Sequence, residues 1–117
     1  DDIRKHSLYP EQYFCSKTTW KKIQNARRVI AVGTTTTRAI GSMGASGELQ
    51  GSTGLFIYPG YDFLITSGLI TNFHLPKSSL LMLVSAFGGY KNIRKAYEHA
   101  INESYRFYSY GDAMLIV

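Results

Sequence analysis

The residues best suited to chemistry are clustered at positions 72–78, which read NFHLPKS. His74 is the one side chain there whose unperturbed pKa suits proton transfer near neutral pH. The amide of Asn72 can orient a substrate group, and a cation at Lys77 would help keep His74 neutral. The alternative is a turn in which His74 caps or packs, and the residue types leave both interpretations open.

A second cluster, GTTTTR at 33–38, follows an apolar run and precedes a helix-like stretch. Backbone N–H groups at Gly33, Thr34 and Thr35 could hold a carboxylate or a phosphate at the helix start. Arg38 could add a bidentate contact. The segment is not a P-loop, because the Gly-Lys-Ser/Thr ending is absent. A plain capping segment with an arginine in its first turns is the other interpretation.

A third cluster, YRFYSYGD at 105–112, combines aromatic rings with an arginine and an aspartate. Tyr108 and Tyr110 could stack on bases, Arg106 could pair with phosphate, and Asp112 could accept from a ribose hydroxyl or a base edge. An ordinary core-and-rim loop would use the same residue types. Tyr58, in the aromatic turn YPGY, could line a substrate, although a structural turn is favoured there.

Hydrophobic patterns and turn residues predict the elements that must position these clusters. Ser16 is expected to cap a helix. The first half is expected to hold an extended segment at 8–14, a helix at 17–25, a strand at 28–32 covered on both faces, a turn into a helix at 34–40 and a mobile Gly/Ser-rich loop at 41–54. The second half is expected to hold a strand at 55–58, a hairpin pairing 63–65 with 69–70, a helix from Ser78 or Ser79 to Phe87, an amphipathic helix at 90–104 and a strand at 114–117.

Alternating strands and helices indicate an α/β fold. The chain has 117 residues, whereas a closed eight-fold barrel takes roughly 250. We therefore expect half of a distorted α/β barrel, or a small open, mostly parallel sheet flanked by helices. A sheet of this size is expected to leave an edge or a face uncovered without more chain.

Composition limits the classes of protein that fit. Apolar residues make up 44% and charged residues 18%, which is typical of a globular domain. No apolar run approaches the ~20 residues of a membrane helix, and no signal-peptide pattern is present. The single cysteine, Cys15, excludes an internal disulfide and favours a cytoplasmic location. His6, His74 and His99 are too far apart in sequence for a zinc pattern, so no metal is expected.

The net charge of +5 and the isoelectric point of about 9.4 favour a polyanionic partner. The basic residues are dispersed along the chain, so solvated helix faces would account for them as well.

Four segments, taken in order, resemble the S-adenosylmethionine:tRNA ribosyltransferase-isomerases of queuosine biosynthesis. They are RVIAVGTTTTR at 28–38, FIYPGY at 56–61, LITNFHLPKSSLLMLVSA at 69–86 and YRFYSYGDAMLI at 105–116. The resemblance implies a distorted α/β barrel that carries an inserted all-β domain. Residues 1–117 are similar to the C-terminal section of the catalytic domain, with the N-terminal part and the inserted domain absent.

The resemblance also implies an activity. Family members transfer and isomerise the ribosyl moiety of S-adenosylmethionine onto 7-aminomethyl-7-deazaguanine at the tRNA wobble position, and they release adenine and methionine as epoxyqueuosine forms. The expected partners are tRNA, S-adenosylmethionine and the remainder of the same enzyme. His74 would remove a ribose C5′ proton or deprotonate the acceptor amine. Substrate-binding roles are expected for Gly33, Thr34, Thr35, Arg38, Tyr58, Asn72, Phe73, Arg106, Tyr108, Tyr110 and Asp112.

The chain departs from the family pattern at three positions. In the stretch that reads His-x-Met-His-x-Glu in the family, His6 and Glu11 match but Tyr9 replaces the second histidine. Gly54 stands where an aspartate is common, and the position of Lys77 is acidic in some members. Two other classes of function stay open: a non-catalytic fragment or RNA-binding module of that enzyme, and a small nucleotide-binding α/β domain.

Overall fold

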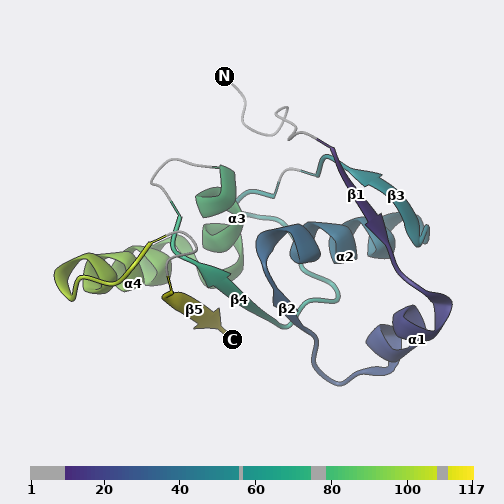
Figure 1. Ribbon diagram of the computed structural model, residues 1–117, viewed down its shortest axis with the longest axis horizontal. Helices are drawn as coiled ribbons and strands as arrows, with labels where there is room; N and C mark the ends of the chain where they lie inside the picture. The colour runs from purple at the N-terminus through teal and green to yellow at the C-terminus, as the bar shows by residue number, and fades with distance from the viewer. Residues whose placement is uncertain (1–9, 56, 75–78, 108–110) are drawn as a thin grey trace.

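The computed structural model describes residues 10–55, 57–74, 79–107 and 111–117, and the fold is α/β, as expected (Figure 1). Its elements are β1 (Glu11–Phe14), α1 (Lys17–Asn25), β2 (Ile30–Val32), α2 (Thr34–Ser46), β3 (Gln50–Thr53), β4 (Gly68–Asn72), α3 (Ser79–Gly88), α4 (Tyr90–Asn102) and β5 (Ala113–Ile116). None of the helices in the described ranges is long and apolar enough to cross a membrane.

The central sheet is three-stranded, with β4 between β2 and β5. β4 runs parallel to β2, with Val32 opposite Ile70, and antiparallel to β5, with Thr71 opposite Met114. The sheet is therefore mixed, whereas the sequence suggested mostly parallel strands. β1 and β3 form a separate antiparallel pair that lies beside α2 in Figure 1.

Residues 41–54 are not a mobile loop. Residues 41–46 continue α2, which ends at Gly47 in the left-handed conformation, and residues 50–53 form β3. The glycines of α2 permit close packing: a Cβ on Gly41 would lie 2.8 Å from the Tyr61 hydroxyl oxygen, and one on Gly44 would lie 2.7 Å from Cδ1 of Ile65. Glycine here makes room for residues 61–66 against the helix, which explains why composition alone was misleading.

Two strand predictions were also wrong. Residues 55, 57 and 58 belong to no strand, although Ile57 is buried, and residues 63–65 do not form a hairpin with 69–70. Leu69 and Ile70 pair instead with β2 and β5, and the backbone N–H groups of Ser67 and Gly68 donate to the Val29 carbonyl. Residues 55, 57 and 58 pack without strand partners, which a periodicity argument cannot detect.

The predictions of α1, α3 and α4 are confirmed to within two residues, whereas α2 continues six residues beyond its expected end at residue 40. The Ser16 hydroxyl caps α1 by accepting a hydrogen bond from the Thr19 backbone N–H at 3.1 Å. Gly89, with φ of 85°, separates α3 from α4. The amphipathic face of α4 buries Ile93, Tyr97 and Ala100, as its 3.6-residue spacing predicts.

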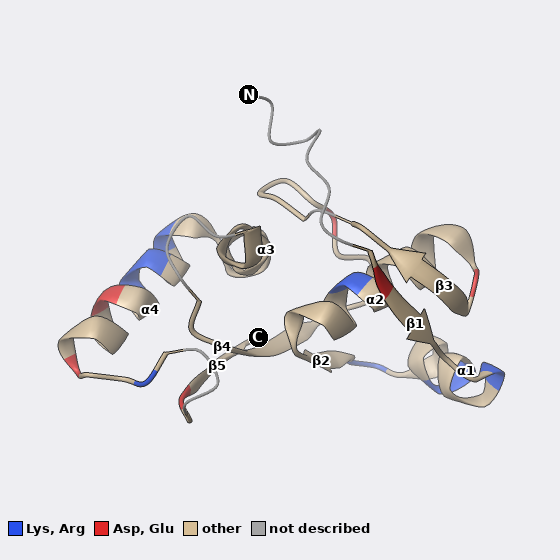
Figure 2. Cartoon of the chain, turned by 45° about the horizontal axis from the view of Figure 1, so that its top comes forward, with Lys and Arg blue, Asp and Glu red and all other residues tan. Residues whose placement is uncertain are grey.

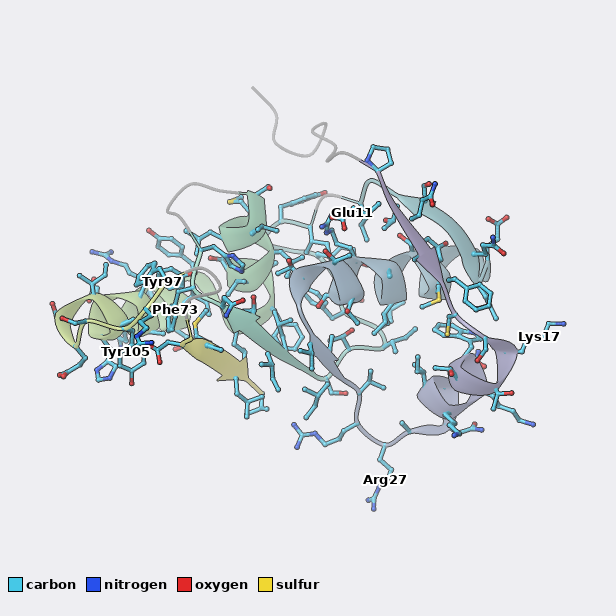
Figure 3. The ribbon with its side chains drawn as sticks, in the orientation of Figure 1. Glu11, Lys17, Arg27, Phe73, Tyr97 and Tyr105 are labelled. Carbon is cyan, nitrogen blue, oxygen red and sulfur yellow. The ribbon has the colours of Figure 1, made fainter. Side chains whose placement is uncertain are left out.

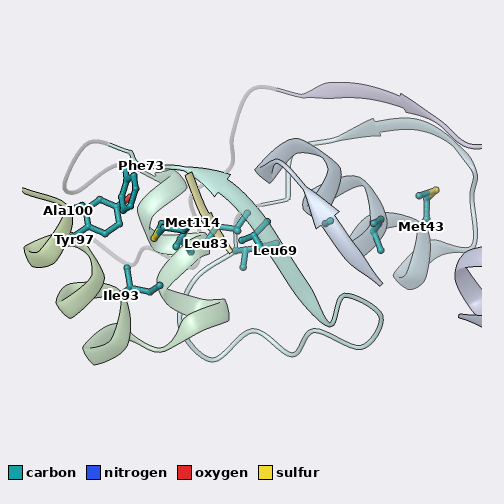
Figure 4. Packing of buried hydrophobic residues seen from close by; sticks show 12 residues of the cluster. Met43, Leu69, Phe73, Leu83, Ile93, Tyr97, Ala100 and Met114 are labelled. Atoms are coloured by element: carbon teal, nitrogen blue, oxygen red, sulfur yellow. The ribbon is translucent and has the colours of Figure 1, made fainter. Parts of the chain in front are cut away.

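The hydrophobic core lies on one face of the sheet, against the helices (Figure 4). Leu69 and Val84 are fully buried there. The opposite face is open: the exposed fractions of Ile30, Val32 and Leu115 are 44%, 65% and 60%. The expectation that residues 28–32 are covered on both faces is therefore wrong for the described residues.

Replacing Leu69 tests this account of the core. Leu69→Ala removes a fully buried side chain from the central strand and should reduce the free energy of unfolding by about 3 kcal/mol. Leu64 is 84% exposed, so Leu64→Ala should change the free energy of unfolding by less than about 0.5 kcal/mol. Urea denaturation followed by circular dichroism measures both values. Equal effects of the two substitutions would contradict the assignment of the core.

Candidate active site at the strand ends

A polar pocket of about 340 Å³ lies at the carboxyl ends of β2 and β4, against the first turn of α2. Because β2 and β4 are parallel, the residues that follow each strand meet at one edge, where open α/β sheets place their ligands. The pocket is lined by Val32, Gly33, Thr34, Thr35, Thr36, Ile70, Thr71, Asn72, His74 and Ala113. The first two sequence clusters are thus brought together in one place.

His74 is the titratable side chain of this pocket. Its Nε2 lies 2.8 Å from the Thr71 hydroxyl, and its backbone N–H donates to the Tyr97 hydroxyl at 2.7 Å. The side chain is half-buried, and this desolvation lowers the pKa of the imidazole from its usual value of 6.5. His74 is therefore held in a fixed orientation and is neutral near neutral pH, so it can accept a proton.

Phe73 anchors this loop to α4. Its ring packs against Tyr97 at 5.2 Å, Phe107 at 5.4 Å and Tyr105 at 5.8 Å between ring centroids (Figure 3). Such contacts add stability beyond the area that they bury. Phe73 is buried and does not line the pocket, so its substrate-binding role stays a prediction. Its position indicates that it holds the neighbouring His74 in place.

The first turn of α2 presents backbone donors to the pocket. Gly33 has φ of 94°, and its own N–H donates to the Ile70 carbonyl at 2.8 Å. The next three N–H groups, of Thr34, Thr35 and Thr36, have no acceptor within the helix, and no side chain caps the turn. All three residues line the pocket. The arrangement suits an anionic group, because the donors converge at the positive end of the helix dipole.

Arg38 lies one turn further along α2 and is almost fully buried. Its Nη2 donates to the Glu11 carboxylate of β1 at 2.5 Å and lies 3.4 Å from the Thr35 hydroxyl, which itself donates to Glu11. Arg38 does not line the pocket, but it contacts Thr35, which does. Its contact with substrate stays a prediction. Figure 3 shows Glu11 above the start of α2.

The third cluster reaches the pocket through Asn72. The Asn72 amide donates to the Asp112 carbonyl at 3.2 Å, and the Asp112 carboxylate accepts from the Arg106 backbone N–H at 2.6 Å. These bonds hold the chain before β5 against the end of β4. The predicted contacts of Tyr108 and Tyr110 lie outside the described residues, as does Lys77.

A second cavity of about 300 Å³ lies between α2 and residues 61–66. Its walls are mainly apolar, with Ile40, Phe63 and Ile65 among them. Burial, and then the charge of Asp62, raises the pKa of Tyr61, so this phenol stays protonated and is no base near neutral pH. Tyr58 accepts the Tyr61 N–H in a neighbouring turn and lines neither cavity. The pocket at the strand ends is the better candidate site, because a neutral imidazole and uncapped N–H groups meet there.

Sequence reasoning gave no role in the site to three residues that shape it: Glu11, Thr71 and Tyr97. Glu11 stood out only as a match to the family pattern. Thr71 could have been found, because it stands three residues before His74 at a strand end. Glu11 and Tyr97 are distant in sequence and meet the site only through the fold. Among the described residues, no three His, Cys, Asp or Glu side chains are close enough together to hold a metal ion.

Known proteins resemble this chain over almost its whole length. A family model described as queuosine biosynthesis protein matches residues 1–116. The chain is 53% identical to the S-adenosylmethionine:tRNA ribosyltransferase-isomerase of Polynucleobacter asymbioticus, over 99% of this chain and 34% of that protein. It is 54% identical to the protein of the same name from Synechococcus elongatus, over 100% and 34% of the two chains.

A solved structure is similar as well. The crystal structure of the S-adenosylmethionine tRNA ribosyltransferase from Thermotoga maritima has a TM-score of 0.82 and 45% sequence identity, over 92% of this chain and 40% of that chain. The chain spans about a third of the length of the curated relatives that it matches. Because the family model covers almost every residue, this chain belongs to the queuosine biosynthesis protein family.

Proposed function

We propose that this chain is part of a cytoplasmic S-adenosylmethionine:tRNA ribosyltransferase-isomerase, the activity named for its relatives. The enzyme would move the ribosyl group of S-adenosylmethionine onto 7-aminomethyl-7-deazaguanine in tRNA and form epoxyqueuosine. The observation that carries the proposal is the single pocket in which a neutral histidine faces the uncapped first turn of a helix.

The first turn of α2 would hold the methionine carboxylate. The N–H groups of Thr34, Thr35 and Thr36 supply donors, and the helix dipole favours a negative charge beside them. Arg38 and Glu11 would act on the same turn through the Thr35 hydroxyl, which both of them contact. A carboxylate in this position would point the sulfonium and its ribose toward the ends of β2 and β4.

His74 would then serve as the base. The sulfonium acidifies the ribose C5′ hydrogens, so removal of one of them would let adenine leave. The aminomethyl group of the acceptor base would then add to the ribosyl group. Methionine would depart as the epoxide closes. If Nε2–H donates to Thr71, the lone pair of Nδ1 is available to accept the proton. Nδ1 has no partner among the described residues, which supports this tautomer.

The acceptor base would approach from the side of Asn72 and Asp112. Asn72 lines the pocket, and its amide is tied to the backbone of Asp112, so both would orient the deazaguanine edge or a ribose hydroxyl. Arg106, Tyr108 and Tyr110 belong to the same segment and would contact the tRNA or the precursor base. Phe73 and Tyr58 would contribute indirectly, through packing and through a turn.

The open face of the sheet would be covered by the remainder of the enzyme. Ile30, Val32 and Leu115 expose apolar side chains next to the pocket, and the curated relatives are about three times as long as this chain. We propose that residues 1–117 form the C-terminal section of the catalytic domain, and that the N-terminal part and the inserted β domain complete it. The same incomplete face supports the alternative that the chain alone is a non-catalytic piece.

The role of His74 can be tested by substitution in the protein of full family length. His74→Ala should lower kcat by about 10²- to 10⁴-fold at saturating substrates, because it removes the base. His99→Ala is the matched control, since His99 lies exposed on α4. The rate should rise with pH as His74 loses its proton, and because its pKa is lowered the midpoint of this rise should lie below the usual value of 6.5. Near-full turnover by His74→Ala would contradict the assignment.

The role of the α2 turn can be tested through Arg38. Arg38→Ala breaks its contacts with Glu11 and Thr35 and should weaken S-adenosylmethionine binding about tenfold, measured by calorimetry. The matched control is Arg94→Ala, which removes an exposed ion pair on α4 and should leave that affinity unchanged. An unchanged affinity in Arg38→Ala, with native circular dichroism, would count against the carboxylate site.

Reconstitution can decide between the enzyme and the non-catalytic piece. The chain alone should show no turnover, and mixing it with a polypeptide that supplies the rest of the family-length protein should restore epoxyqueuosine formation, measured by mass spectrometry of tRNA digests. Val32→Asp should reduce the recovered activity, because it places a charge on the apolar sheet face. Full activity of the chain by itself would rule out an incomplete site.

A further inference from the structure

We propose that α1 and the segment that follows it form a second contact with RNA, a surface that grips the sugar-phosphate backbone outside the reacting pocket. We call it the α1 basic surface and define it by Lys17, Lys21, Lys22, Arg27 and Arg28. The inference rests on the proposed function in one respect: it takes the RNA to be the tRNA substrate.

The charge distribution along the sequence is the first observation. Residues 12–47 contain six basic residues and no aspartate or glutamate, although the whole chain has eight acidic residues. Arg38 is the one buried member of the six, and its partner Glu11 lies just outside this range. The five others are exposed, and none of them pairs with a carboxylate among the described residues. Their charge is therefore not neutralised locally.

The geometry of α1 gathers these charges on one side. At 3.6 residues per turn, Lys17 and Lys21 lie one above the other, and Lys22 lies about 100° further round the helix from Lys21. Trp20 and Ile23 occupy the opposite side, where both are partly buried and Trp20 packs against the core. Figure 2 shows the basic residues on α1 and on the segment that leads into β2. In Figure 3 the side chains of Lys17 and Arg27 point away from the rest of the chain.

A shallow hollow on this side adds neutral donors. It is lined by Thr18, Lys21, Lys22, Asn25 and Ala26, and it measures about 480 Å³. A threonine hydroxyl and an asparagine amide between two lysines are the groups that commonly bind phosphate and sugar oxygens without reading the base. Successive lysines one helical turn apart can follow successive phosphates of one strand.

The contrast with α4 indicates that this is more than a solvated helix face. α4 also carries three basic residues, Lys91, Arg94 and Lys95, but it carries the acidic Glu98 as well, which pairs with Arg94 at 3.1 Å. Alternating charges of this kind are typical of a helix that faces water. α1 has no acidic residue at all, so the two helices provide an internal comparison.

RNA fits this surface better than a membrane does. An interfacial helix inserts its apolar side into the lipid, but the apolar side of α1 already packs against its own chain. Ile23 of α1 also lines a cavity together with Thr35 and Thr36, and both of these threonines line the reacting pocket as well. An RNA held on α1 would thus stay close to the pocket while one nucleotide enters it.

The test is the salt dependence of tRNA binding by the full-length protein. The variant Lys21→Gln/Lys22→Gln/Arg27→Gln should weaken binding of unmodified tRNA about tenfold at low salt and raise its KM. The slope of log affinity against log salt should fall by about 2, because each lost phosphate contact contributes about 0.7 to 0.9. S-adenosylmethionine affinity should not change.

The control variant is Lys91→Gln/Lys95→Gln on α4, which should leave the slope at the wild-type value. If the α1 variant keeps the wild-type salt slope and tRNA affinity, the proposal is overturned. It is also overturned if the α1 variant loses binding to phosphatidylserine vesicles while its tRNA binding persists. If the wild-type protein binds tRNA but never turns it over, the proposed activity fails. The salt slope of the α1 variant then still tests whether the α1 basic surface binds RNA, independently of the activity.

Discussion

The parallel pairing of β2 with β4 is the constraint on which the site depends. It places Val32 opposite Ile70, and the Gly33 N–H then donates to the Ile70 carbonyl at the point where β2 ends. This bond fixes where α2 begins relative to the end of β4. The uncapped N–H groups of α2 and the imidazole of His74 therefore line one pocket, although they come from segments about 40 residues apart.

Two clusters away from the sheet hold the two walls of the pocket. The rings around Phe73 fix the end of β4 to α4, and the hydrogen bond from the His74 backbone to the Tyr97 hydroxyl extends that support to His74 itself. On the other side, the ion pair of the buried Arg38 with the partly exposed Glu11 ties the start of α2 to β1. Support of this kind keeps a site in its productive geometry, because the supporting side chains cannot easily reorient.

Local signals in the sequence predicted the parts of this arrangement that depend on local physics. The cap at Ser16, the amphipathic face of α4 and the glycine break at Gly89 all appear where expected. Gly41 and Gly44 were misleading, because their role is to admit Tyr61 and Ile65 from another segment. The motif around His74 indicated a base, but the contacts of His74 with Tyr97 and of Arg38 with Glu11 join residues 23 and 27 positions apart. Contacts of this kind follow from the fold and leave no local pattern.

The central claim is that the pocket at the strand ends binds S-adenosylmethionine with its carboxylate on α2 and its ribose toward His74. A crystal structure of the full-length protein with S-adenosylmethionine tests it most directly. The account predicts the carboxylate within hydrogen-bond distance of the N–H groups of residues 34–36, and the ribose C5′ within reach of the His74 imidazole. Density for the ligand in the apolar cavity between α2 and residues 61–66 instead, with the strand-end pocket occupied by solvent, would contradict it.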